Sequence, residues 1–181
     1  MDLGNINESC KANVGGTGTK ILYAPMSDFD AIQQATAKSA ATTADEIVTI
    51  ATAHTFLTGK GFHSLEVGLD TGGVESNSVG EIGGKSFEHM VNGFVNNNDK
   101  ITLGTLSALA SCKYMFLVPE TTEDGTVYRQ IGTEQRAAYC EDNSYKSGNT
   151  STDKRGTSFS FKSTGHATHA PFYTSTITMH P

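Results

Sequence analysis

The sequence predicts a mainly β protein, a barrel or sandwich of roughly eight strands flanked by one helix. Short segments of alternating apolar and polar residues recur along the chain, with turn-forming residues between them. Glycine is frequent at 19 residues, while hydrophobic content is modest at 36%, which suits short strands and turns. Helical spacing of apolar residues is clear only in 100–112. A length of 181 residues predicts a single domain over 1–181.

The N-terminal part of the chain begins with a polar arm, 1–19. Its GGTGTK segment lacks the Gly-Lys-Ser/Thr ending of a phosphate-binding loop. The next segment, Lys20–Pro25, is expected to be a strand. Residues 27–41, with Ser27 as a possible N-cap, are expected to form either a short helix or an ordered loop. The β-branched segment 46–53 is expected to be a strand.

The stretch 64–95 is the longest alternating segment, and we interpret it as a long hairpin around a glycine-rich connection. Because side chains alternate between the two faces of a strand, the apolar face must be buried. The apolar residues of the first strand are Leu65, Val67 and Leu69. The expected inner face of the returning strand comprises Phe87, His89, Val91, Gly93 and Val95.

Most of the net charge lies on this hairpin. Five carboxylates accompany Lys85 alone, which gives about −4 of the formal −6. They are Glu66, Asp70, Glu75, Glu81 and Glu88. The residues therefore predict a ribbon with one apolar and one acidic face, and pairing between subunits would satisfy its open edges.

The second half of the chain opens with the expected helix, 100–112, which Asn98 or Asp99 can cap. An apolar strand at 113–119 follows. The acidic-glycine turn Glu123-Asp124-Gly125 then predicts a hairpin with a return strand at 126–131.

Three further strands are expected toward the C-terminus, at 136–141, 157–163 and 172–179. The strand 157–163 alternates cleanly and places Phe159 and Phe161 on one face. A long polar loop, 142–156, separates the first two strands.

No group of residues predicts an active site, a metal site or a cofactor site. His166 and His169 could bind zinc only with further ligands at suitable spacing, so a loop with two histidines is the simpler interpretation. Glu66 and Asp70 could form a glycosidase-like carboxylate pair, but the chain has no Trp to stack on a sugar. No Gly-x-Ser-x-Gly motif occurs. We therefore expect a protein that is not an enzyme.

Composition also restricts the compartment and the partners. A net charge of −6 disfavours a general nucleic-acid binder. No apolar leader and no membrane-spanning run is visible, so we expect synthesis in the cytoplasm and no membrane insertion. The three cysteines are far apart and form no Cys-x-x-Cys motif, so free thiols are expected at Cys10, Cys112 and Cys140.

The order of elements in the second half carries a resemblance. A core helix runs into an apolar strand, an acidic-glycine turn and a strand that ends at Gly132. A polar loop, an alternating aromatic strand and the tail Pro171-Phe172-Tyr173 follow. This order is similar to that of the major tail tube proteins of tailed bacteriophages and related injection systems. The segment KGFHSLEVGLDTGGVESNSVGEIGGKSFEHMVNGFV resembles their lumen-lining hairpin, and the resemblance extends over most of 20–175.

The resemblance implies a tail-tube-type fold and a structural, non-enzymatic role in the virion. Such proteins form rings, commonly hexameric, that stack into a hollow tube and conduct the viral genome. The implied partners are further copies of the chain, other tail proteins at the tube ends, and DNA in transient passage. The five carboxylates of the hairpin would face the channel or its rim and repel phosphates. The arm 1–19 and the loop 142–156 would contact neighbouring subunits.

Two other classes remain open from the sequence. One is a different virion structural protein, such as a tail terminator or a capsid decoration protein. The other is a β-sandwich binding module.

Overall fold

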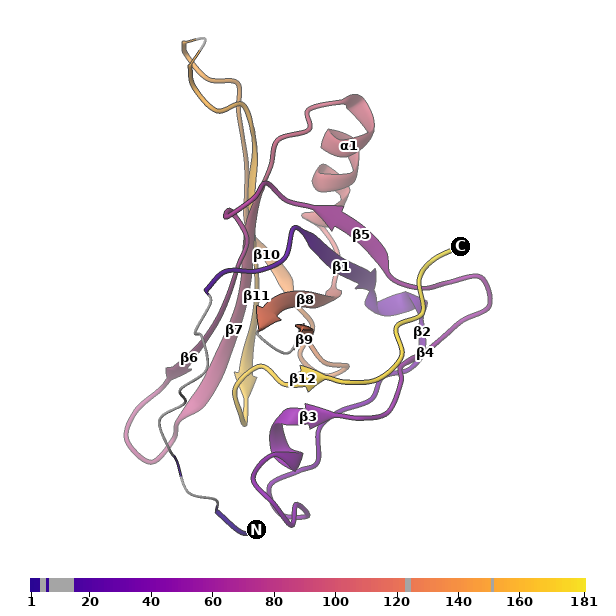
Figure 1. The fold of residues 1–181 in the computed structure, drawn as a ribbon, viewed down its shortest axis with the longest axis vertical. Coiled ribbons are helices and arrows are strands. Elements are labelled where there is room, and N and C mark those ends of the chain that lie inside the picture. The colour runs from indigo at the N-terminus through magenta and orange to yellow at the C-terminus, as the bar shows by residue number, and fades with distance from the viewer. Residues whose placement is uncertain (4–5, 7–14, 123–124, 151) are drawn as a thin grey trace.

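The described residues fold into a six-stranded and a four-stranded β-sheet that face each other, a small two-stranded sheet and one α-helix, and the predicted mainly β class is confirmed (Figure 1). The computed structural model describes residues 1–3, 6, 15–122, 125–150 and 152–181. Much of the predicted arm 1–19 and the turn residues Glu123 and Asp124 thus lie outside the described residues. Within the described part, no helix is long and apolar enough to cross a membrane.

The larger sheet has six strands and is antiparallel except for its β3–β12 pair. Its central strand β8 begins with a fully buried run from Tyr114 to Pro119, which explains the continuous apolar sequence there. In spatial order the strands are β3 (Thr49–Ile50), β12 (Phe172–Tyr173), β9 (Gly125–Ile131), β8 (Tyr114–Thr122), β1 (Lys20–Pro25) and β5 (His63–Glu66).

The second sheet has four antiparallel strands, and Figure 1 shows it nearly edge-on along one side of the molecule. Its two central strands are the longest of the fold, with 11 residues in β11 and 10 in β7. In spatial order the strands are β10 (Tyr139–Lys146), β11 (Gly156–His166), β7 (Ser86–Val95) and β6 (Gly73–Val79).

The main core lies between the two sheets. Alternate residues of β7 and β11 are buried, as the period-2 pattern predicted for these strands. Prominent members of this core are Ile21, Leu65, Val67, Val91, Val95, Phe116, Phe159 and Phe161. Phe161 packs on Phe116 with ring centroids 4.7 Å apart, which joins the two sheets at the centre of the core.

A second, smaller core covers the other side of the six-stranded sheet. Leu22, Met115 and Leu117 contribute to it from the sheet. The segment between β1 and β5 folds over them through two 3-10 turns, Met26–Asp28 and Glu46–Val48, and the strand pair β2 (Phe29–Ala31) and β4 (Thr55–Phe56). This arrangement makes the segment an ordered loop rather than the alternative short helix.

The helix α1 spans Lys100–Leu109, close to the predicted 100–112. Its N-cap is Asp99, whose Oδ1 accepts a hydrogen bond from the backbone N–H of Thr102 at 2.6 Å. Leu106 and Leu109 are buried against the core, whereas Ile101 is exposed. The helix therefore packs through one apolar stripe.

A close contact between strands explains the glycine at position 93. A Cβ built on Gly93 would lie 2.7 Å from Cζ of Phe159 and 2.8 Å from Cγ1 of Val67. We expect Gly93→Ala to lower the free energy of unfolding by about 2 kcal/mol, because the ring and the valine must shift in a packed core. Urea unfolding measures the change. Gly104→Ala is the matched control, since a Cβ there meets nothing within 4 Å, and it should stabilise α1 by about 0.5–1 kcal/mol.

The predicted hairpin over 64–95 was wrong in its first strand. Residues 63–66 form β5, which pairs with β1 in the six-stranded sheet, and the hairpin partner of β7 is β6, from Gly73 onward. Leu65 and Val67 are buried as expected, but Leu69 is 77% exposed. The chain turns there, and Asp70 has φ 56°, so the strand period no longer applies.

The bounds of several other elements differ from the predicted ones. The loop expected over 142–156 begins later, because β10 continues through Lys146 and pairs with β11. The strand expected at 136–141 corresponds to the start of β10, which begins at Tyr139. The strands expected at 46–53 and 172–179 reduce to the two-residue strands β3 and β12. In each case pairing to a neighbouring strand, which local composition does not specify, decides the length.

Candidate assembly surface

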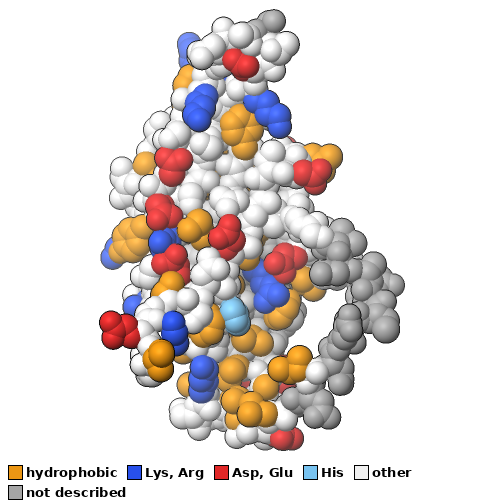
Figure 2. All heavy atoms as spheres, turned by 90° about the vertical axis from the view of Figure 1, so that its left-hand side faces the viewer, with side chains coloured by type: hydrophobic (Ala, Val, Ile, Leu, Met, Phe, Trp, Pro, Cys, Tyr) orange, Lys and Arg blue, Asp and Glu red, His pale blue; other side chains and the backbone are white. Residues whose placement is uncertain are grey.

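The four-stranded sheet turns one face toward the core and the other toward solvent, and we call the second the outer face. Strand register defines its rows, since directly paired residues of antiparallel strands share a face. One row runs from Glu75 through Met90 and Lys162 to Tyr139. The row beside it runs from Gly73 through Asn92 and Ser160 to Asp142. Figure 2 shows this side of the molecule, with acidic and basic side chains interspersed.

Lys162 lies at the centre of the charged groups on the outer face. Its Nζ is 2.9 Å from Oε1 of Glu88 on β7 and 3.3 Å from Oε1 of Glu141 on β10. The hydrogen bond to Glu88, followed by that to Glu141, raises the pKa of Lys162. The lysine thus bridges three neighbouring strands and remains charged at neutral pH.

The structure distributes the five predicted carboxylates over three places. Glu75 and Glu88 lie on the outer face, through their registers with Met90 and Asn77. Glu81 lies in the turn between β6 and β7. Glu66 lies on β5, opposite Lys20, and Asp70 lies in the turn that follows β5. The expectation that Glu66, Asp70 and Glu88 share one ribbon face is therefore wrong.

Sequence reasoning missed the charged residues that β10 and β11 bring to the outer face. They are Lys162, Glu141, Asp142 and Lys146. The alternation of 157–163 contained the signal for Lys162, because the face opposite Phe159 and Phe161 includes it. With Glu75 and Glu88, the outer face has four carboxylates against two lysines, so it is acidic but not uniformly so.

The two edges of this sheet are the second feature of the surface. Among the described residues, β6 pairs only with β7, and β10 pairs along its length only with β11. From β10 to β6 the sheet contains three antiparallel pairings in succession. Because each pairing reverses the strand direction, the two edge strands β6 and β10 run in opposite directions. If a second copy is related by rotation, its β10 would meet β6 as an antiparallel neighbour. Unpaired backbone groups on such edges favour added strands.

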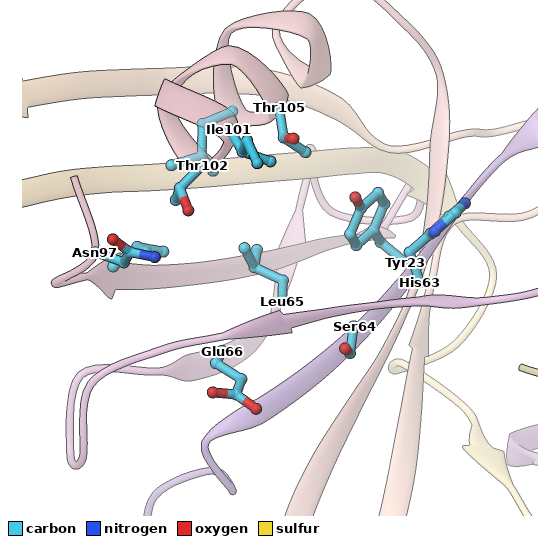
Figure 3. Close-up of a pocket in the computed structure, with 11 residues that line it drawn as sticks. Tyr23, His63, Ser64, Leu65, Glu66, Asn97, Ile101, Thr102 and Thr105 are labelled. Atoms are coloured by element: carbon cyan, nitrogen blue, oxygen red, sulfur yellow. The ribbon is translucent and has the colours of Figure 1, made fainter. Parts of the chain in front are cut away.

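A groove of about 430 Å³ lies between α1 and β5 and is drawn in Figure 3. Tyr23, His63 and Leu65 line it from the strands, and Thr102 and Thr105 line it from the helix. The lining combines hydroxyl, imidazole and carboxylate groups with aliphatic side chains, so the groove offers both polar and apolar contacts.

The histidines considered for a metal site are separated in the structure. His166 is buried and stacks on His89 of β7, with ring centroids 4.0 Å apart and an interplanar angle of 12°. His169 is exposed and contacts Ser76 and the ring of Phe87 instead. No group of three or more His, Cys, Asp or Glu in the described part of the chain is arranged to hold a metal ion.

The stacked pair is held in its neutral form. Ser163 Oγ lies 2.6 Å from Nε2 of His166, and Nε2 of His89 lies 2.9 Å from the carbonyl oxygen of Thr168. Burial, then the neighbouring His89 and Arg136, lowers the pKa of His166 to about 4. Burial also lowers the pKa of His89. The pair is thus a structural contact between the ends of β7 and β11 that acid would disturb.

Comparisons with protein-family models, with curated proteins and with solved structures give no match to this chain.

Proposed function

We propose that this chain is a virion structural protein whose copies form rings, and that the rings stack into a phage tail tube that conducts DNA. The observation that carries the proposal is the four-stranded sheet, which combines long strands, a polar outer face and two edge strands that have no further strand partner among the described residues. A monomer would leave these edges exposed, whereas a closed ring of sheets would pair them.

The dimensions of such a ring suit a DNA channel. Six copies, the ring size that the resemblance implies, would contribute 24 strands from their four-stranded sheets. With a strand spacing of about 4.8 Å and a tilt of about 40°, the closed barrel has a backbone radius of about 24 Å. Side chains extend about 5 Å from each wall, half the usual spacing between stacked sheets, which leaves a channel roughly 38 Å wide. A DNA duplex is narrower than such a channel and could pass through it without contacting the whole wall.

The charge of the outer face supports the same role. A lumen with more carboxylates than lysines repels phosphates, so DNA would pass without being held. The ion pairs of Lys162 with Glu88 and Glu141 neutralise its charge locally and keep the lysine from acting as a phosphate site.

Electron microscopy of the purified protein in negative stain tests the proposal. We expect hollow tubes, or rings that stack as concentration rises, and sedimentation well above the 19.2 kDa monomer. Single rings that never stack would indicate a tail terminator instead. A monomer at all concentrations would contradict the proposal and favour a capsid decoration protein or a binding module.

A further inference from the structure

Cys112 and Cys140 lie on two segments that run past each other in opposite directions. Contacts fix these segments on both sides of the cysteines. On one side, Nδ2 of Asn143 donates to the carbonyl oxygen of Leu106 at 2.6 Å. On the other, Tyr114 and Ala138 exchange two backbone hydrogen bonds, at 3.0 and 2.9 Å. The chain from 106 to 114 is therefore held alongside the chain from 143 back to 138.

The two cysteines lie between these two contacts, each two positions from the bridged pair Tyr114–Ala138. Tyr114 faces Ala138, and Nζ of Lys113 lies 5.9 Å from the ring centre of Tyr139, as expected for the next pair. Cys112 and Cys140 come next on the two segments, where the backbone pairing has ended and the chain bends at residue 112. A disulfide spans Cα atoms roughly 4.4–6.8 Å apart, a range that includes the usual spacing of a bridged pair such as Tyr114 and Ala138 beside them.

The two thiols differ in exposure. Cys140 is half-buried against the main core, in register with Phe161. Cys112 is exposed at the rim of that core, and after burial its proximity contributes to raising the pKa of Tyr114 to about 12. The Cys140 thiol donates to the carbonyl oxygen of Asp142 at 3.5 Å.

We propose that Cys112 and Cys140 are a reversible redox pair that forms an intramolecular disulfide with a small disulfide, such as oxidised glutathione, as the oxidant. Cys112 is exposed, so its thiolate attacks a glutathione sulfur and releases one glutathione thiolate. The Cys140 thiolate then attacks the Cys112 sulfur and releases the second glutathione. Two protein thiols become one disulfide, one oxidised glutathione becomes two reduced ones, and their protons pass to the released thiolates.

The bond would fasten the C-terminal end of α1 to β10, an edge strand of the four-stranded sheet. It would close a loop over 112–140 and so restrict the unfolded chain more than the folded one. One consequence rests on the proposed function: a virion protein would keep both thiols during assembly in the reducing cytoplasm and form the bond after release.

Oxidation of the full chain carrying Cys10→Ser tests the pair, because that change leaves only Cys112 and Cys140 to react. Treatment with oxidised glutathione should give a monomer that lacks two hydrogens by intact mass and has no alkylatable thiol. Its melting temperature should rise by several degrees, and dithiothreitol should reverse every change. The matched control, Cys10→Ser with Cys140→Ser, should instead carry a stable glutathione adduct on Cys112.

Lasting glutathione adducts or disulfide-linked dimers of the Cys10→Ser protein would overturn the pair. Peptide mapping of the oxidised natural chain gives the same decision without any substitution, since it identifies a 112–140 linkage or its absence. Neither readout uses tube formation, so failure of the redox pair and failure of the proposed function are distinguishable.

Discussion

Tubes in which Glu75 and Asp142 are both replaced by lysine are expected to hold duplex DNA at low salt, whereas tubes of the natural chain release it. Both carboxylates lie on the outer face, and neither forms an ion pair with Lys162. Each replacement changes the charge by two, so six subunits would add twelve lysines to one ring. If about five of them contact phosphates, the affinity for DNA should fall roughly 500-fold between 50 and 200 mM salt.

The assay measures retention of a short labelled duplex by assembled tubes across a salt series. Glu66→Lys with Asp70→Lys is the matched control, because it makes the same charge change outside the strands of the four-stranded sheet. The control tubes should retain as little duplex DNA as tubes of the natural chain. Equal retention by both variants, or none by the outer-face variant in intact tubes, would place the channel on another surface of the molecule.

Acid is expected to destabilise the folded chain strongly between pH 6.5 and about 4. The pKa of His166 falls from 6.5 to about 4 on folding, so the unfolded chain takes up its proton first as the pH decreases. The free energy of unfolding is therefore unaffected by this group above pH 7 and declines as the pH falls toward 4. A shift of this size corresponds to about 3 kcal/mol for a dry site, and we expect about 2 kcal/mol because partial hydration screens the charge.

Urea unfolding at pH 7 and pH 4.5 measures this effect, with His166→Asn as the test variant. The shorter amide can still bond Ser163 but does not titrate, so the loss of stability on acidification should shrink by about 2 kcal/mol. His169→Asn is the control, because its side chain is exposed and outside the stacked pair. The same acid sensitivity in the natural chain and in His166→Asn would assign the effect to other groups.

Local patterns were reliable where an element depends on its own residues. The strand Lys20–Pro25 has the predicted bounds, and Asp99 caps the predicted helix. The faces of β7 and β11 follow the alternation of their apolar residues, with Val91 and Phe161 inward. These features are encoded within a few residues, by burial on one face and by capping of free N–H groups.

Local sequence patterns predicted the candidate assembly surface only in part. Alternation placed Glu88 on the face away from the core, but it could not show that Lys162, more than seventy positions later, forms an ion pair with it. Nor could it separate Glu66 from Glu75, because both lie in an acidic segment and only strand pairing assigns them to different sheets.

The sequence alone therefore determined the β-rich class, the helix and its cap, and which side of each long strand is buried. The tertiary structure decided which strands are neighbours. It pairs β5 with β1 rather than with β7, extends β10 along β11, and brings His166 onto His89 and Tyr114 beside Ala138. A period-2 pattern fixes the face of a strand but carries no information about its partner, because backbone hydrogen bonds between strands are the same for every sequence. That choice depends on how the two apolar faces fill one core, which is a property of the whole chain.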